Sequence, residues 1–305
     1  MVAESYDPNF HANVTAVHGD AGARWLPNIP RLIAEIAQAW DLRLGEPYEL
    51  SWNYVAPATR DDGLACVVKL TVPGTSGLAR EATALEGFAG RGAVALLARD
   101  DSRGALLLER AEPGREVAEL GPDRDGEATT ILCSVMQRLW CPPPVEHQLP
   151  SVIDYGAAFA DYRARCPTGG PLPSHLVERA AELLEQLAAS ASRTVLLHGD
   201  LHHHNVLQAR REPWLAIDPH GLTGCPGFDV GAMLYNPITM TADQLLRLLP
   251  ARLDQLCAVP DLDPDRVVGW AFVMAILSEV WSAEDHNEID GRPLAIAEVL
   301  YRQLA

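Results

Sequence analysis

The stretch LLHGDLHHHNVL, residues 196–207, constrains this chain more than any other part of the sequence. Short apolar runs flank it and predict two strands, with the polar residues on the loop between them. The loop carries Asp200 and Asn205, and the next apolar segment, PWLAIDPHG, contains Asp218 at its polar end. A loop carboxylate can orient a hydroxyl and accept its proton, while an amide and a second carboxylate are oxygen ligands suited to magnesium. The residue types of this stretch are therefore compatible with a site that has one base and two metal ligands.

The histidines of the same stretch allow a different interpretation, a zinc site. His202, His203 and His204 would have to converge on one ion with His198 and His220. Adjacent histidines on an extended segment point to opposite faces, and no cysteine or carboxylate lies at a supporting ligand spacing. We therefore expect histidines that lie on a loop and do not share a zinc ion, with His202 near the group that reacts at Asp200.

The charge and length of the chain narrow the class of protein. It has 305 residues, of which 48% are hydrophobic, and a formal net charge of -17. That length suffices for one large domain or for two lobes with real cores. Binding nucleic acid through a basic face requires clustered Lys and Arg, so we expect no nucleic-acid partner. An acidic surface instead attracts small cationic molecules.

Nothing in the sequence predicts export or a membrane partner. The amino terminus MVAESYDPNF lacks a basic region followed by an apolar core, and the longest apolar run, WAFVMAIL, is too short to span a bilayer. The six cysteines are scattered without a C-x-x-C pair, which is typical of reduced thiols. We expect a cytoplasmic protein.

Apolar periodicity divides the chain into a strand-rich front and a helix-rich back, which predicts an α+β fold with lobes at residues 1–110 and 111–305. The front elements are a helix over 25–40, strands in YELSWNYVAP and LACVVKLTV joined through ATRDDG, a helix in SGLAREATALEGFA, and strands in AVALLAR and ALLLER. The back helices are expected over 128–139, 152–165, 174–189, 242–256 and 267–283.

The frame H-x-D-L-x-x-x-N, followed by an aspartate at the end of the next strand, resembles the catalytic loop of kinases. Over nearly its whole length the chain resembles the aminoglycoside phosphotransferases, and most closely their streptomycin 6-phosphotransferase and hydroxyurea phosphotransferase branch. The segments that carry the resemblance are WLPNIPRLIAEIAQAWDL, ACVVKL, LLLERAEPG, LHGDLHHHNVL, EPWLAIDPHGLTGCPGFDVG and GWAFVMAILSEVWSAED. It implies the two-lobed protein-kinase-like fold, with a small antiparallel-sheet lobe carrying one main helix and a helical extension, followed by a larger helical lobe.

The resemblance also implies an activity, the ATP- and magnesium-dependent phosphorylation of a hydroxyl on a small cationic acceptor. Streptomycin is the first candidate. A kinase of an aminosugar or another metabolite is an alternative, because such enzymes can share every catalytic residue. A non-catalytic nucleotide- or zinc-binding regulatory protein is a further alternative, which the intact catalytic positions disfavour.

Residue roles follow from the resemblance position by position. It implies Asp200 as the catalytic base. It implies Asn205 and Asp218 as magnesium ligands. Lys69 would contact the nucleotide phosphates, with Glu81 as its ion-pair partner.

The nucleotide contacts depart from the general kinase pattern. No G-x-G-x-x-G precedes Lys69, and LSWNYV takes its place. We expect phosphate contacts from Ser51, Asn53 or backbone N–H groups there, and further nucleotide contacts from the backbone around Glu109 to Ala111, with the nucleotide between the lobes.

Two further departures concern the catalytic segments. Gly199 replaces the arginine that follows the histidine in protein kinases, and DPH replaces D-F-G, which indicates a small-molecule acceptor. Asp229 in PGFDVG is expected to hold the catalytic loop in place. The end of the last long apolar helix is expected to bind the acceptor through Trp281, Glu284 and Asp285, with Glu279, Glu288 and Asp290 as further cation contacts.

Overall fold

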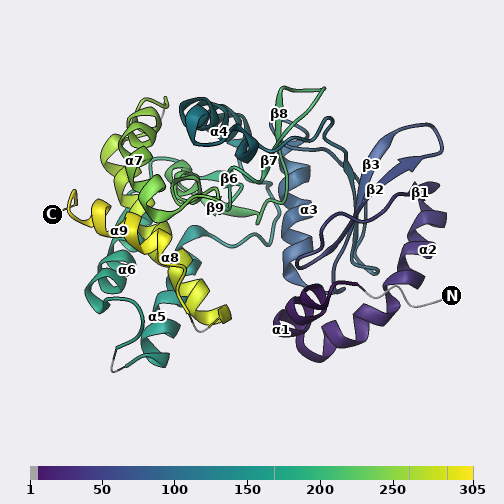
Figure 1. Cartoon of the computed structure of the whole chain (residues 1–305), viewed down its shortest axis with the longest axis horizontal. Helices are drawn as coiled ribbons and strands as arrows, with labels where there is room; N and C mark the ends of the chain where they lie inside the picture. Colours follow the sequence, from purple (N-terminus) through teal and green to yellow (C-terminus); the bar gives the residue numbers. More distant parts are fainter. Residues whose placement is uncertain (1–5, 168, 261, 287, 305) are drawn as a thin grey trace. The chain divides into compact units, whose positions relative to one another are not determined.

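A computed structural model describes residues 6–167, 169–260, 262–286 and 288–304, except for the side chains of residues 285 and 286. Its contacts divide the chain into two compact units, drawn in Figure 1. The first unit is Met1–Gly90 with Val94–Ala111, and the second is Arg91–Ala93 with Glu112–Ala305.

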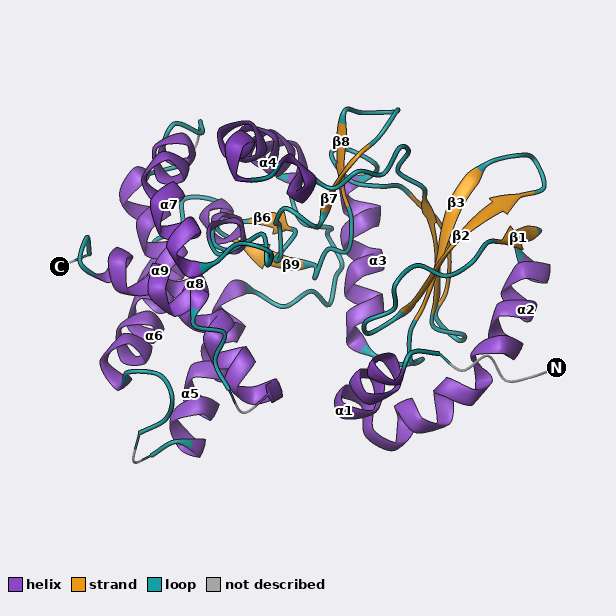
Figure 2. Cartoon of the chain, in the orientation of Figure 1, coloured by secondary structure: helices purple, strands orange, loops and turns teal. Residues whose placement is uncertain are grey.

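The first unit is built on an antiparallel sheet of strand order β1-β2-β3-β5-β4. Helix α3 lies on one side of this sheet and α2 on the other (Figure 2). The strands are β1 (Leu42–Leu44), β2 (Tyr54–Arg60), β3 (Ala65–Leu70), β4 (Leu96–Asp100) and β5 (Ala105–Glu109). The helices are α1 (Pro8–Trp25), α2 (Ile29–Ala39) and α3 (Ser76–Phe88).

Strand β3 shows how the sequence positions Lys69. Alternate side chains of a strand point to opposite faces. Cys66, Val68 and Leu70 are buried in the apolar core that the sheet shares with α1 and α2. Lys69 therefore points to the other face, where it meets Glu81 of α3.

Two expectations about the first unit are wrong in detail. The helix predicted over 25–40 is two helices, α1 and α2, separated by a 3-10 turn at Leu26–Asn28. Pro30 lies in the first turn of α2, where a proline's missing N–H costs nothing, so it favours a new helix start. The strand predicted in YELSWNYVAP begins only at Tyr54, because the chain before it folds back as a loop closed by the bond from Tyr48 N–H to the carbonyl of Val55.

The second unit is mainly helical and holds two short antiparallel strand pairs, β6 with β9 and β7 with β8. The strands are β6 (Val195–Leu197), β7 (Val206–Gln208), β8 (Trp214–Ala216) and β9 (Leu222–Gly224). The helices are α4 (Asp125–Leu139), α5 (Gly156–Arg165), α6 (Ser174–Ala189), α7 (Ala242–Cys257), α8 (Pro264–His286) and α9 (Arg292–Tyr301). The predicted back helices are confirmed, and the loops from β6 to β7 and from β8 to β9 carry the polar residues of the candidate site.

Helix α8 is the core helix of this unit and packs against α5, α6, α7 and α9. Its apolar stretch is longer than the run WAFVMAIL suggests, since Pro264–Glu284 is long and apolar enough to cross a membrane by length and composition. Inside the fold, 67% of the most apolar 18-residue stretch of this helix is buried. A helix that is apolar on all sides is typical of a protein core as well as of a membrane span, and here it is enclosed by the other helices.

Candidate active site

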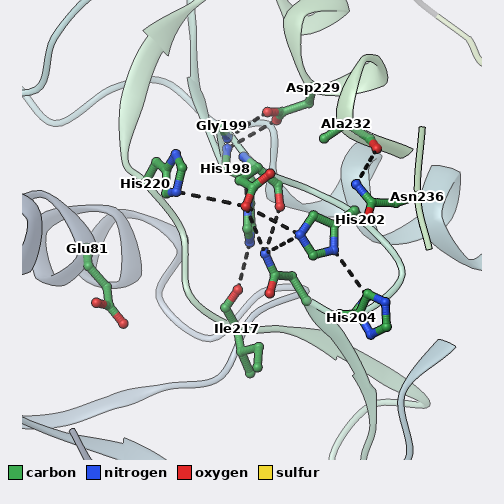
Figure 3. A network of polar contacts seen from close by, with 12 residues as sticks. Glu81, His198, Gly199, His202, His204, Ile217, His220, Asp229, Ala232 and Asn236 are labelled. Atoms are coloured by element: carbon green, nitrogen blue, oxygen red, sulfur yellow. Dashed lines mark hydrogen bonds and ion pairs between the residues drawn. The ribbon is translucent and has the colours of Figure 1, made fainter. Parts of the chain in front are cut away.

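Asp229 fixes the start of the β6–β7 loop. It lies in the 3-10 segment Pro226–Val230 and is 2% exposed. Its two carboxylate oxygens accept the backbone N–H groups of His198, at 3.1 Å, and Gly199, at 2.8 Å (Figure 3). This is the holding role predicted for Asp229. Burial raises the pKa of Asp229 to about 7, against the opposing effect of the two N–H groups.

Gly199 is the residue that this geometry requires. Its φ is +85°, a conformation that side chains rarely adopt. A Cβ at this position would lie 2.1 Å from the Cδ2 atom of Leu222, so that buried side chain would have to shift. The departure from the arginine of protein kinases therefore has a steric cause.

His198 joins the two polar loops of the site. Its Nδ1 accepts the backbone N–H of Asp200 at 3.2 Å, so the proton is on Nε2, which donates to the carbonyl of Ile217 at 2.9 Å. Its own carbonyl accepts the N–H of His220 at 2.8 Å. Complete burial lowers the pKa of His198 to about 4, so the ring is neutral at physiological pH.

The Asp200 carboxylate lies at the centre of these contacts. Its Oδ2 is 3.4 Å from Nε2 of His202, 3.9 Å from Nε2 of His220 and 3.4 Å from Nδ2 of Asn205. Burial raises the pKa of Asp200, but His202 and then His220 and His198 outweigh burial and hold it below its usual range. The group is therefore a carboxylate, able to accept a proton, over the physiological pH range.

Asn205 and Asp218 lie on neighbouring backbone although 13 positions separate them. The carbonyl of Asn205 accepts the N–H of Ile217, the residue before Asp218, at 2.9 Å. The Asn205 amide donates through Nδ2 to the Asp200 carbonyl at 2.9 Å, which leaves its Oδ1 as an acceptor. Asp218 is exposed and has a φ of +56°, a strained conformation for a residue with a side chain and one that is common at functional sites. An amide oxygen and a carboxylate are the kinds of ligand that magnesium prefers, so the predicted metal role of these two residues stays a prediction.

The remaining loop histidines have separate partners. His203 is 2% exposed, and its Nε2 is 3.4 Å from a guanidinium nitrogen of Arg252. His204 meets the Glu116 carboxylate through Nδ1 at 2.6 Å. Within the described residues, no group of three or more His, Cys, Asp or Glu side chains is placed to hold a metal ion. The loop thus uses its histidines one by one rather than as a cluster.

In the first unit, Lys69 and Glu81 form the predicted ion pair. Nζ of Lys69 lies 2.7 Å from Oε2 of Glu81, and the side chains are 7% and 6% exposed. A charge pair this buried is costly to maintain for stability alone, so it marks a candidate functional position.

Comparisons with known proteins agree with this geometry. Residues 44–286 match a family described as aminoglycoside/hydroxyurea antibiotic resistance kinase. The chain belongs to this family. Streptomycin 6-kinase of Streptomyces glaucescens is 31% identical over 95% of this chain and 94% of its own length. Hydroxyurea phosphotransferase of Kitasatospora aureofaciens is 34% identical over 92% of this chain and 82% of its own length.

The fold is confirmed by solved structures. A thermostable mutant of an aminoglycoside phosphotransferase, in ternary complex with ADP and hygromycin B, matches with a TM-score of 0.61 and 17% identity over 89% of this chain and 98% of that one. The protein is a small-molecule kinase with the protein-kinase-like α+β fold, as the sequence predicts.

The kinase's other predicted nucleotide contacts lie in the first unit. Ser51 is exposed in the loop before β2, and its carbonyl accepts the side-chain amide of Asn13 at 3.1 Å. Glu109 ends β5 and bonds Ala95 twice, through its N–H at 2.8 Å and its carboxylate at 2.9 Å. Ala111 follows in the chain as the last residue of the first unit. The roles of these residues stay predictions.

The predicted acceptor residues lie at the end of α8. Trp281 packs edge-on against Tyr155 with ring centroids 5.3 Å apart. Glu284 pairs with Arg165 of α5 at 2.5 Å, so a cationic acceptor would have to compete with that arginine. The side chain of Asp285 lies outside the described residues.

Glu279 does not fit the role of a cation contact. It is 0% exposed, and it accepts the backbone N–H groups of Asp290, Gly291 and Leu294 at 2.8, 2.7 and 3.0 Å. It therefore anchors the start of α9. Asp290 is engaged as well, in an ion pair with Arg292.

Sequence reasoning missed a buried polar contact of the second unit, the one made by Arg252 and Asp125. Arg252 stands on α7 and is 1% exposed, and Asp125 opens α4 and is 5% exposed. No motif spacing connects two residues 127 positions apart. The one available signal is weak, an arginine in a helix whose neighbours Leu249, Leu253 and Leu256 form the apolar face.

Proposed function

We propose that this kinase transfers the γ-phosphate of ATP to a hydroxyl of streptomycin and so confers resistance, acting in the cytoplasm. The observation that carries the transfer step is the environment of Asp200, a carboxylate kept ionised by His202 and bonded by Asn205. The oxygen of the acceptor hydroxyl forms a bond to the γ-phosphorus while the bond from that phosphorus to the leaving ADP breaks. Asp200 accepts the proton of this hydroxyl. The acceptor is proposed from the relatives named streptomycin kinases and from the net charge of -17, which suits a cation.

ATP and magnesium are proposed as cofactors. Lys69, oriented by Glu81, would hold the nucleotide phosphates. Asn205 and Asp218 would hold the magnesium, which neutralises charge on the phosphates when bound. Replacing Asp218 with Ala should weaken magnesium-dependent ATP binding more than replacing Asn205 with Ala, because a carboxylate brings a formal charge and an amide only a dipole. Equal, small effects in ATP titrations with and without magnesium would contradict this assignment.

Hydroxyurea is a second candidate acceptor, because a hydroxyurea phosphotransferase matches this chain at 34% identity. An aminosugar is a third, since the catalytic residues alone do not select the acceptor. The decisive experiment incubates purified protein with magnesium–ATP and each of streptomycin, hydroxyurea and glucosamine. ADP release and the mass of the product report the transfer.

The Asp200→Asn variant tests the chemistry in the same assay. It should lose about a hundredfold or more in turnover and retain its fold, because it removes a positioned base without changing side-chain size. The matched control is Asp254→Asn, an exposed aspartate on α7. Wild-type turnover in Asp200→Asn would refute the base. Phosphorylation of glucosamine but not streptomycin would refute the resistance role and leave the kinase mechanism intact.

A further inference from the structure

Arg252 uses every donor that a guanidinium possesses. An arginine side chain has five N–H groups in a planar fork. Nε and Nη2 donate to the Asp125 carboxylate, at 3.0 and 2.6 Å. Nη1 donates to the carbonyls of Met233 and Asn236, both at 2.7 Å. The remaining Nη2 hydrogen points to Nε2 of His203, at 3.4 Å.

One of these contacts reaches the proposed catalytic loop directly, and two others lie close in sequence to the segment that supports it. His203 lies between Asp200 and Asn205 on the β6–β7 loop, and its carbonyl accepts the N–H of Ala118 at 3.1 Å. Met233 and Asn236 follow, within a few residues, the 3-10 segment that carries Asp229. Asp229 in turn holds His198 and Gly199 at the front of the loop (Figure 3). Arg252 thus touches the back of the loop and the stretch of chain that follows the segment fixing its front.

We infer that Arg252 is a positioning residue for phosphoryl transfer, which sets the catalytic-loop geometry through His203. The inference rests on the proposed role of Asp200. Arg252 contacts neither Asp200 nor Asn205, so it acts only through the backbone that carries them. A displacement of about 1 Å in a reacting group can cost on the order of a hundredfold in rate, so a support of this kind affects turnover even at a distance.

The contact between Arg252 and His203 can be removed without leaving a buried charge unpaired. In His203→Leu the ion pair of Arg252 with Asp125 stays, but the acceptor on the loop is lost. In His203→Gln the side-chain oxygen can occupy the place of Nε2 and accept the same N–H. We expect His203→Leu to lower kcat about tenfold with KM for ATP and for streptomycin within about twofold of wild type, and His203→Gln to restore most of kcat.

Two further variants complete the test. Arg252→Lys keeps the charge but has three donors for five acceptors, so kcat should fall. Combined with His203→Leu, it should lower kcat by less than the product of the two single effects, because both variants lose the contact between Arg252 and His203. The matched control is His175→Leu, at an exposed histidine on α6. Unchanged kcat in His203→Leu, equal losses in the Leu and Gln variants, or a rise in KM alone would each overturn the inference.

Hydrogen exchange separates this inference from the proposed function. Amide exchange of residues 198–207 should be faster in His203→Leu than in the wild-type protein and His203→Gln, while exchange in α7 stays unchanged. This readout does not depend on which acceptor the enzyme uses. If wild-type protein phosphorylates no acceptor yet the exchange pattern appears, the proposed function fails and the positioning contact stands. Unchanged exchange of the loop overturns the inference.

Discussion

Each unit of the molecule contains a buried ion pair, and the two pairs are built differently. Lys69 and Glu81 lie 12 residues apart on β3 and the following helix, with side chains 7% and 6% exposed. Arg252 and Asp125 lie 127 residues apart on α7 and α4, with side chains 1% and 6% exposed. Burial alone therefore does not distinguish them.

The chemistry of the two cations does distinguish them. Every N–H of Arg252 has an acceptor in the protein. The acceptors are the Asp125 carboxylate, the His203 ring and two main-chain carbonyls. An arginine held in this way has no donor left for a ligand. Lys69 carries a compact ammonium on a flexible stem, a group that can exchange partners when a phosphate arrives. The planar guanidinium of Arg252, held by Asp125, His203 and main-chain carbonyls, therefore suits a structural role, while a mobile ammonium is compatible with the nucleotide contact proposed for Lys69.

The largest expected effect comes from breaking the second pair. Arg252→Met leaves the Asp125 carboxylate buried without a cation and deprives two carbonyls of a donor. Removing one partner of a buried pair costs about 3–5 kcal/mol, and we expect the upper end of that range. Urea unfolding measures it, with Arg247→Met, at an exposed arginine of the same helix, as the control. A loss of less than about 1 kcal/mol in the free energy of unfolding would show that this pair does not stabilise the fold to the extent we expect.

Replacing both residues of each ion pair should separate the two pairs by their effect on stability. Replacement of a buried pair by apolar residues is often neutral for stability. We therefore expect Lys69→Met with Glu81→Leu to change the free energy of unfolding by less than about 1 kcal/mol while abolishing turnover. Asp125→Leu with Arg252→Met should still lose about 2 kcal/mol or more, because Met233 and Asn236 remain without their donor. Equal stability losses in the two double variants would contradict the distinction.

The same comparison shows what the sequence could predict. The first pair was predicted from the family resemblance, and local order makes it possible, because the lysine lies on a strand and the glutamate on the next helix. The Asp200–Asn205–Asp218 spacing was likewise sufficient to bring these residues to adjacent loops, because the short strands β7 and β8 pair directly.

What could not be predicted depends on packing between distant segments. Arg252 is one of several charged residues on an amphipathic helix, and its burial depends on tertiary contacts with Asp125, His203 and main-chain carbonyls that no sequence pattern reports. Glu279 was misassigned for the opposite reason. Its position near the acidic end of α8 suggested a solvent-facing carboxylate, but the chain after α8 returns and presents three N–H groups to it.

Asp229 is a buried carboxylate held by two backbone N–H groups rather than by an arginine or lysine pair, and we expect an effect of intermediate size there. Burial raises its pKa from 3.8 to about 7, so the folded protein binds this proton more tightly than the unfolded chain. The group therefore opposes folding increasingly as pH rises from about 4 to 7. The unfolding free energy of wild type minus that of Asp229→Asn should fall across this range, by at most about 1.4 kcal/mol per pH unit. A flat difference between pH 5 and 8 would contradict the raised pKa.

The smallest effect on stability is expected at an exposed pair, Arg165 with Glu284. Pairs of this kind contribute about 0–1 kcal/mol to stability. We therefore expect the free energies of unfolding of Glu284→Gln and Arg165→Gln to lie within about 0.5 kcal/mol of the wild-type value. Their effects on function should have opposite signs. If Glu284 binds a cationic acceptor, its neutralisation raises KM for streptomycin a few-fold, whereas Arg165→Gln removes the competing cation and lowers it. Steady-state kinetics with Glu185→Gln as an exposed control measures both, and parallel shifts in KM would exclude Glu284 as an acceptor contact.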